Sequence, residues 1–205
     1  MARDLMPIVK RSRREKTPLH PKAVKGLTVR NYAPGEHGQS RLRNKVTEYG
    51  VQLREKQKVK RMYGLLEKPF RRVVAEAERR PGVSGDILVE LLERRLDNAV
   101  YRLNWAPSRQ SARQLVTHGH VVLNGRRVDI PSIQLKPGDE LTVRPKSASN
   151  TYFTGLKAEL PNNQPTIGWL SLDTKNLKAK VTGLPPRDEV KEEIHEQLII
   201  EFYSR

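Results

Sequence analysis

Two histidines separated by a single glycine, His118 and His120, have the residue type and spacing of metal ligands. A zinc site needs further His, Cys or carboxylate ligands, and the sequence has no cysteine and no His-Glu-x-x-His motif to supply them. We therefore expect no metal and no cofactor. One histidine is predicted to end a helix, and the other to lie on the surface or against a nucleic acid.

Two other short motifs carry a chemical meaning in other proteins. Gly35 to Gly38 has the G-x-x-G spelling of a KH-domain loop, but it lies in Pro/Gly-rich sequence rather than between two helices. Arg95-Leu96-Asp97 resembles the tripeptide around the catalytic aspartate of some pseudouridine synthases, but the Thr-x-Gly that commonly follows is replaced by Asn98-Ala99-Val100. We interpret the first motif as a plain loop and Asp97 as a structural residue.

Catalytic motifs of other classes do not stand out. The sequence shows no Gly-rich phosphate loop, no Gly-x-Ser-x-Gly and no paired-carboxylate spacing. An enzyme would therefore have no obvious place for its chemistry, and we expect a binding protein rather than an enzyme.

Positive charge is the dominant property of the chain. Its 205 residues include 39 Lys and Arg against 23 Asp and Glu, which gives a net charge of +16 and a pI near 10.3. Up to Arg72 there are 20 basic and 6 acidic residues, so the first third carries most of the excess. A solvated helix face would explain any one basic run, but the density as a whole favours a polyanionic partner.

Composition also indicates the compartment. The absence of cysteine argues against a secreted, disulfide-dependent fold. No run approaches the roughly eighteen apolar residues of a membrane span, and the first residues lack the apolar block of a signal peptide. We therefore expect a cytoplasmic protein without a membrane partner.

The positions of apolar residues predict three helices after an irregular start. Residues 1–45 combine Pro, Gly and basic residues and predict no regular structure before a partner binds. From Val46 onward, Val59, Met62 and Tyr63 follow helical spacing, with basic residues on another face. A second helix is predicted in KPFRRVVAEAERR, and a third from residues 84–86 to Leu103.

A small helix-and-hairpin module follows. Ser108 is predicted to cap a short helix that Gly119 ends, with Arg109 and Arg113 facing outward. Asn124-Gly125 is a strong hairpin signal, because both central positions of a type I′ turn need positive φ. The predicted strands are residues 121–123, 126–130 and 140–143.

The last third is less clearly patterned. Between Pro145 and Pro185 we predict no particular element. RDEVKEEIHEQL is predicted to form an acidic helix with Val190, Ile194 and Leu198 inward, followed by the apolar run IIEFY.

Long segments resemble one family. YGVQLREKQKVKRMYGLLEKPFRR, LLERRLDNAVYRLNWAPSRQSARQLVTHGHVVLNGRRVDIPS and the ending EQLIIEFYSR are similar to protein four of the bacterial small ribosomal subunit, and SRRE and PGEHG occur earlier in matching order. The resemblance covers nearly the whole chain except residues 146–185. Some relatives carry zinc-binding cysteines near the N-terminus, and this chain has none.

The resemblance implies a ribosomal, ribonucleoprotein function. Members of the family bind a multi-helix junction in the 5′ domain of small-subunit rRNA early in ribosome assembly. They also line the path by which messenger RNA enters, beside proteins three and five, contribute to translational accuracy, and in some bacteria repress their own messenger RNA. The alternatives are a stand-alone RNA-binding chaperone and an RNA-modifying enzyme with the same module, and the enzyme would need an additional catalytic domain.

The resemblance also implies the architecture. We expect an α+β fold in which a helical domain, completed by the C-terminal helix, accompanies a small α/β RNA-binding module of two helices on a short, mostly antiparallel sheet. The predicted divisions are an extended basic arm (1–45), the helical domain (46–94, with 187–205 packed on it), the module (95–150) and an extension with linker (151–186).

The candidate RNA-binding residues are basic or polar residues in these segments. They are Arg11, Arg13, Arg14, His37, Arg41, Arg43, Arg54, Lys56, Lys58, Arg61, Arg71, Arg72, Arg109, Arg113, His118, His120, Asn124, Arg126 and Arg127.

Overall fold

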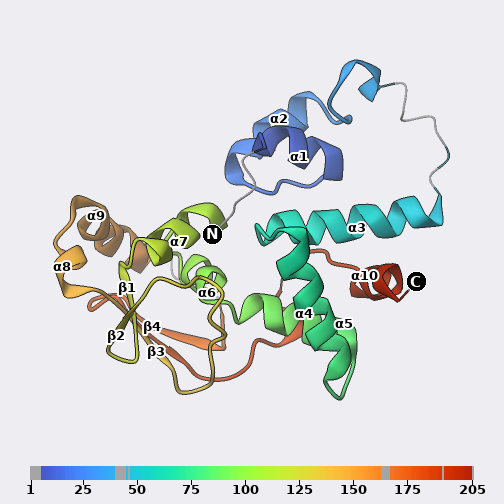
Figure 1. Cartoon of the computed structure of the whole chain (residues 1–205). Coiled ribbons are helices and arrows are strands. Elements are labelled where there is room, and N and C mark those ends of the chain that lie inside the picture. Colours follow the sequence, from blue (N-terminus) through green and yellow to red (C-terminus); the bar gives the residue numbers. More distant parts are fainter. Residues whose placement is uncertain (1–5, 40–44, 46, 163–166, 191, 205) are drawn as a thin grey trace. The chain divides into compact units, whose positions relative to one another are not determined.

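The computed structural model describes the chain except residues 1–5, 40–44, 46, 163–166, 191 and 205 (Figure 1). It divides into two compact units, Met1–Leu88 with Glu192–Arg205, and Val89–Lys191. The predicted separation of an arm at 1–45 from a helical domain stays a prediction. The mixed α+β fold class is confirmed.

Helices build the first unit. They are α1 (Ile8–Glu15), α2 (Val24–Val29), α3 (Glu48–Met62), α4 (Glu67–Arg79), the start of α5 (Ser84–Glu93), α10 (Glu196–Tyr203) and the short 3-10 helices η1 (Pro21–Ala23) and η2 (Glu36–Gly38). The side chain of Thr47 caps α3 by accepting from the backbone N–H of Gly50 at 3.2 Å. Helix α10 packs against α3 (Figure 1), and Val59, Phe70 and Ile199 are fully buried.

The expectation of an irregular N-terminal segment is wrong for the residues that the structure describes. Helix α1 packs against other segments of its own chain. Ser12 is fully buried, and its hydroxyl donates to the carbonyl of Ile8 at 3.0 Å and accepts from the N–H of Leu19 at 3.2 Å. Helix α1 also contacts both α2 and α3.

The second unit contains one antiparallel sheet and the helices around it. The strands are β1 (Val121–Leu123), β2 (Arg126–Val128), β3 (Glu140–Val143), β4 (Leu170–Asp173) and β5 (Lys178–Val181), in the order β2-β1-β3-β5-β4. The helices are α6 (Leu96–Arg102), α7 (Arg109–Thr117), α8 (Pro145–Ala148), α9 (Thr151–Glu159) and the 3-10 helices η4 (Leu160–Asn162) and η5 (Arg187–Glu189). Trp105 and Leu141 are fully buried in the core that these elements share.

The hairpin agrees with its sequence signal. Asn124 and Gly125 have φ of 49° and 78°, as a type I′ turn requires, and the register pairs Leu123 with Arg126. The Asn124 amide donates to Asp139 at 2.8 Å, and its oxygen accepts from the N–H of Glu140 at 2.8 Å. The turn is therefore fastened to the start of β3.

The predicted single helix from residue 84 to Leu103 is in fact two helices. Arg95 has φ of −64° and ψ of 137°, and it forms a β-bridge with Gln134. The N–H of Leu96 donates to the carbonyl of Ile133 at 2.9 Å instead of continuing the helix. Leu88, Leu92, Leu96 and Leu103 are fully buried, but pairing with a distant segment breaks the helix.

The acidic C-terminal helix is also wrong. Val190 and Ile194 are buried, but Val190 is extended and helix α10 begins only after His195. The N–H of His195 donates to Glu55 Oε1 at 2.9 Å, which fixes the chain just before the helix. The helix instead contains the apolar run that was expected to follow it.

Candidate nucleic-acid interface

The two arginines of α7 belong to a buried polar network and do not face outward, so that expectation is wrong. Arg109 donates to Asn98 Oδ1 at 2.8 Å and lies 3.9 Å from Glu93, while Arg113 lies 3.7 Å from Asp97. Their side chains are only 14% and 17% exposed. Their charge is used mainly to hold α7 beside the junction of α5 and α6.

The acids of this network are satisfied by arginines. Arg95 donates to both oxygens of Asp97, at 3.0 and 2.7 Å, and Arg102 donates to both oxygens of Glu93 at 2.8 Å. Bidentate pairs of this kind fix geometry as well as charge. The structural interpretation of Asp97 therefore has a physical basis, since the carboxylate anchors the break between α5 and α6.

Most of the basic residues predicted on α3 are also paired within the protein. Lys56 donates to Glu67 at 2.9 Å and lies 4.7 Å from the centre of the Phe202 ring, and its side chain is 6% exposed. Lys58 pairs with Glu55 at 2.9 Å. Sequence periodicity predicts that these basic residues share one face of the helix. It does not predict their acidic partners, Glu55 of α3 and Glu67 of α4.

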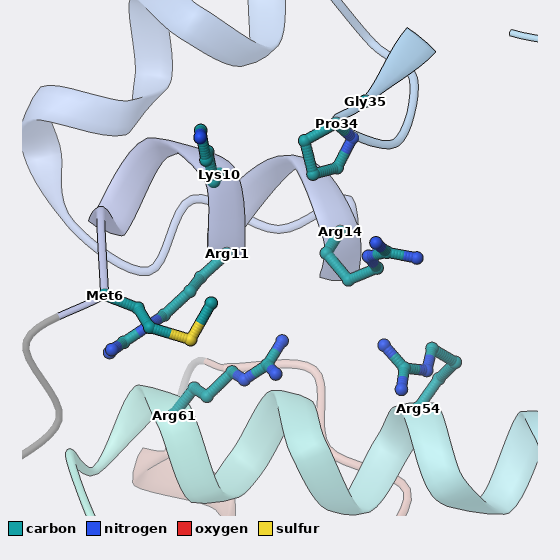
Figure 2. Close-up of a pocket in the computed structure, with 8 residues that line it drawn as sticks. All are labelled: Met6, Lys10, Arg11, Arg14, Pro34, Gly35, Arg54 and Arg61. Atoms are coloured by element: carbon teal, nitrogen blue, oxygen red, sulfur yellow. The ribbon is translucent and has the colours of Figure 1, made fainter. Parts of the chain in front are cut away.

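Arg54 and Arg61 share one buried carboxylate from α1. Arg54 donates to Glu15 Oε1 at 3.2 Å, and Arg61 contacts the same oxygen. Burial raises the pKa of the Glu15 carboxyl, although the charges of Arg54, Arg61 and Arg14 oppose this. Figure 2 shows both arginines extending from α3 toward α1, where they line a pocket. One carboxylate of α1 thus holds two arginines of α3, and the three side chains together carry one net positive charge when all are ionised.

The N-terminal candidates differ in exposure. Arg11 is buried, and Arg13 donates to the carbonyl of Tyr32 at 3.1 Å while its guanidinium covers the ring of the same residue. Arg14 is half-buried and His37 is exposed. Arg41 and Arg43 lie outside the described residues.

Two groups of arginines remain open to solvent. Arg71 and Arg72 are exposed on α4, and Arg126 and Arg127 are exposed on β2 beside the exposed Asn124. In the part of the chain that the structure describes, none of these arginines is paired with a carboxylate. The geometry therefore leaves their charges available to an anionic partner.

The two histidines lie at the end of α7, beside the hairpin. His118 is exposed, whereas His120 is half-buried against Phe153, and its Nδ1 lies 2.9 Å from Ser147 Oγ. Burial, and then the charges of His118, Arg144 and Arg127, lower the pKa of His120. Among the described residues, no three potential ligands come together as a metal site.

Arg144 lies with His118 and Arg127 around His120, although it is absent from the candidates predicted from the sequence. Its backbone N–H donates to the carbonyl of His120 at 2.8 Å, which places it at the end of β3 next to β1. The guanidinium of Arg127 lies against Gly119, at the end of α7. The sequence does place Arg144 directly after the predicted strand 140–143. It does not show that this strand pairs with β1, and this pairing brings Arg144 next to His120.

Comparison with known proteins gives these surfaces a context. Residues 3–93 match the family described as ribosomal protein S4/S9 N-terminal domain, and residues 94–141 match the S4 domain. The chain is 48% identical to the small ribosomal subunit protein uS4 of Chloroflexus aurantiacus and 49% identical to that of Chlorobaculum tepidum, over the full length of both chains in each case. The chain belongs to the uS4 family. The uS4 of Clostridioides difficile is 53% identical over 179 residues, which cover 87% of this chain and 84% of that protein.

The two family matches meet at a structural landmark of this chain. The first ends at residue 93, the last residue of α5, and the second begins at 94, immediately before the bridge formed by Arg95. The relatives are named as a ribosomal subunit protein, and the uS4 family is not an enzyme family. In the described part of the chain, no helix is long and apolar enough to cross a membrane.

Proposed function

We propose that this protein is a structural component of the small ribosomal subunit in the cytoplasm and binds small-subunit rRNA directly. The observation that carries the proposal is the full-length identity of nearly half with uS4 proteins. The net charge of +16 supports it, because a phosphate backbone neutralises such an excess.

The contact surface that we favour consists of the arginines that the fold leaves without an internal acid. On the second unit it combines Arg127 with His118 and Arg144, whose charges all act on His120, and Arg126 at the turn end of β2. On the first unit Arg71 and Arg72 are open on α4. The full set of RNA-binding candidates from the sequence stays a prediction. Four of its members pair with carboxylates of the protein itself, namely Lys56, Lys58, Arg109 and Arg113.

Binding to rRNA is tested with the full-length protein and a transcript of the small-subunit 5′ domain, titrated at several salt concentrations. Each neutralised phosphate should contribute about −0.9 to the slope of log affinity against log salt. A large-subunit transcript of equal length serves as the control. Equal affinity for the two transcripts, or a slope near zero, would contradict the proposal, and so would pseudouridine formation by the pure protein.

Finer aspects follow from the family resemblance and are proposed with it. The rRNA site is a multi-helix junction of the 5′ domain, bound early in assembly, with proteins three and five as neighbours along the path of messenger RNA. The protein thereby contributes to translational accuracy, and it binds its own messenger RNA as a repressor. Crosslinking in cells followed by sequencing of the bound RNA tests both RNA targets. The rRNA junction and the protein's own messenger RNA should each give a separate peak of crosslinked reads.

A further inference from the structure

Asn124 is the one asparagine of the sequence that a glycine follows. An asparagine amide can react with the backbone nitrogen of the next residue, and a side chain on that residue hinders the approach. Gly125 has no side chain, and the space around its α-carbon is open. Asn124 is itself exposed, so water and solvent base reach the turn. The residue types and their surroundings therefore suit deamidation at this position.

The reaction needs no reagent besides water. The backbone nitrogen of Gly125 gives its proton to solvent base and forms a bond to Cγ of Asn124, and the bond between Cγ and Nδ2 then breaks. Nδ2 leaves as ammonia, and a cyclic succinimide remains. Water opens the ring at either carbonyl carbon, which gives aspartate or isoaspartate. Overall one water is consumed and one ammonia is released, without oxidation or reduction.

The fold holds the reacting amide at both of its polar atoms. Nδ2 of Asn124 donates to Asp139 Oδ1 at 2.8 Å, and Oδ1 of Asn124 accepts from the backbone N–H of Glu140 at 2.8 Å. Both bonds direct the amide toward the start of β3, whereas ring closure requires it to turn back to its own backbone. Turning the amide costs both bonds. The contact with β3 therefore slows the reaction.

We propose that Asn124 is a modification site, converted spontaneously to aspartate or isoaspartate at a rate that its contact with β3 limits. Local opening of the turn frees the amide and lets the reaction proceed, whereas the fastened turn prevents it. The converted form then accumulates with the age of the protein. This chemistry is independent of the proposed function.

The products cannot restore the contact. An aspartate side chain has no N–H to donate to Asp139, and the two carboxylates repel each other. An isoaspartate adds a carbon to the main chain of a turn whose register pairs Leu123 with Arg126. Conversion therefore releases the turn from β3 and lowers the net charge next to Arg126 by one.

A second turn of the same unit provides a matched comparison. Asn176 donates from Nδ2 to Asp173 Oδ2 at 2.7 Å, and both residues are exposed. The residue that follows is Leu177, whose side chain hinders attack on the amide. The two asparagines thus have the same kind of carboxylate bond, but only Asn124 has a glycine after it.

The test measures conversion at each asparagine by peptide mass spectrometry after incubation of the full-length protein at mildly alkaline pH. Asp139→Ala removes the acceptor of Asn124, and we expect conversion there to become severalfold faster than in the wild type. Asp173→Ala removes the acceptor of Asn176, and we expect that residue to stay unconverted over the same time. Wild-type protein in guanidinium chloride loses both contacts and should convert Asn124 severalfold faster than native protein.

Each comparison has a result that overturns part of the proposal. Equal rates at Asn124 in the native and the denatured wild type would exclude protection by the fold, and this comparison stands even if Asp139→Ala does not fold. An unchanged rate in a folded Asp139→Ala protein would exclude the contact with Asp139 as the cause. If denatured protein converts Asn124 no faster than Asn176, Asn124 is not a special site.

A further variant tests what conversion does to the turn. Asn124→Asp reproduces the aspartate product, and we expect it to lower Tm because of repulsion by Asp139. In the Asp139→Ala background this repulsion is absent, so the same substitution should lower Tm clearly less. An equal loss of Tm in both backgrounds would show that the product does not release the turn in this way.

Discussion

The neighbours of a basic residue, rather than its type, decide whether its charge is available to RNA. Arg109 and Arg126 belong to the same unit, and the sequence predicts an RNA-binding role for both. Arg109 lies in a buried network with Asn98 and Glu93, whereas Arg126 is exposed on β2. Partners brought by other elements make this difference, and the sequence alone does not show which basic residues acquire such partners.

The open arginines of β2 provide the first prediction. Replacing Arg126 and Arg127 with Gln should leave Tm nearly unchanged, because neither side chain is paired with a described carboxylate. Binding to rRNA should weaken, and the negative slope of log affinity against log salt should become shallower by roughly one for each phosphate that these arginines no longer neutralise. Lys175→Gln with Lys180→Gln removes the same charge from exposed residues of this unit and is the control. Equal slopes for the two double variants would refute the assignment.

The turn between those strands provides the second prediction. Gly125 has φ of 78° and open space around its α-carbon, so Gly125→Val should destabilise the protein through backbone strain alone, by about 1 kcal/mol or more. Gly183 is equally open but has no positive φ, and Gly183→Val should cost clearly less. Chemical denaturation of both variants measures the difference. Equal costs would show that φ is not the cause.

Between elements, Glu67 of α4 connects three helices of the first unit. It accepts from Lys56 at 2.9 Å and Lys60 at 2.7 Å, both on α3, and from the hydroxyl of Tyr203 of α10 at 2.7 Å. Burial would raise the pKa of Glu67, but the bonds from Lys60, Tyr203 and Lys56 together outweigh it and lower the pKa to about 2. The ionised form is therefore the one that the fold favours.

This shift predicts an acid dependence of stability. A carboxyl whose folded pKa lies below its ordinary 4.5 contributes stability in full above that pH and loses it as the pH falls toward 2. Glu67→Gln should therefore be less stable than the wild type at pH 7, with the difference shrinking between about pH 4.5 and pH 2. Free energies of unfolding across this range measure it, with Glu78→Gln, an exposed residue of α4, as control. A difference independent of pH would contradict the assignment.

Local patterns predicted those elements whose signals are local. Helix α3, helix α4 and helix α7 follow apolar spacing and capping residues, and the hairpin follows Asn124-Gly125. The break at Arg95 depends on a bridge to Gln134, and β3 pairs with β5, whose sequence is weakly patterned. Pairings between distant segments leave no periodic signal, which explains the errors at α5, β4 and β5.

At the scale of the whole molecule, the second unit has a core of its own. Its buried cluster extends along the sequence from Leu96 to Val181 and includes residues of β1, β3, β4 and β5, with Val128 of β2 packed against it. A unit with a separate core is expected to fold without the rest of the chain. We predict that a fragment of residues 84–191 unfolds cooperatively on heating, as followed by circular dichroism.

A shorter fragment tests the reason for this stability. A fragment of residues 84–160 lacks β4 and β5. In it β3 has no neighbouring strand on the side of β5, and Leu141 loses its cross-strand neighbour Ala179. Cooperative unfolding should then be lost. If the shorter fragment unfolds as sharply as the longer one, β4 and β5 are not part of the folding unit.

The position of β2 at the end of the sheet has a consequence for the free protein. One side of β2 has no neighbouring strand in the described sheet, and such an edge can pair with the edge of another molecule. Arg126 and Arg127 place two positive charges there, so two copies that approach edge to edge repel each other. The same arginines that we assign to RNA would thus also keep newly made protein from aggregating until a polyanion covers them.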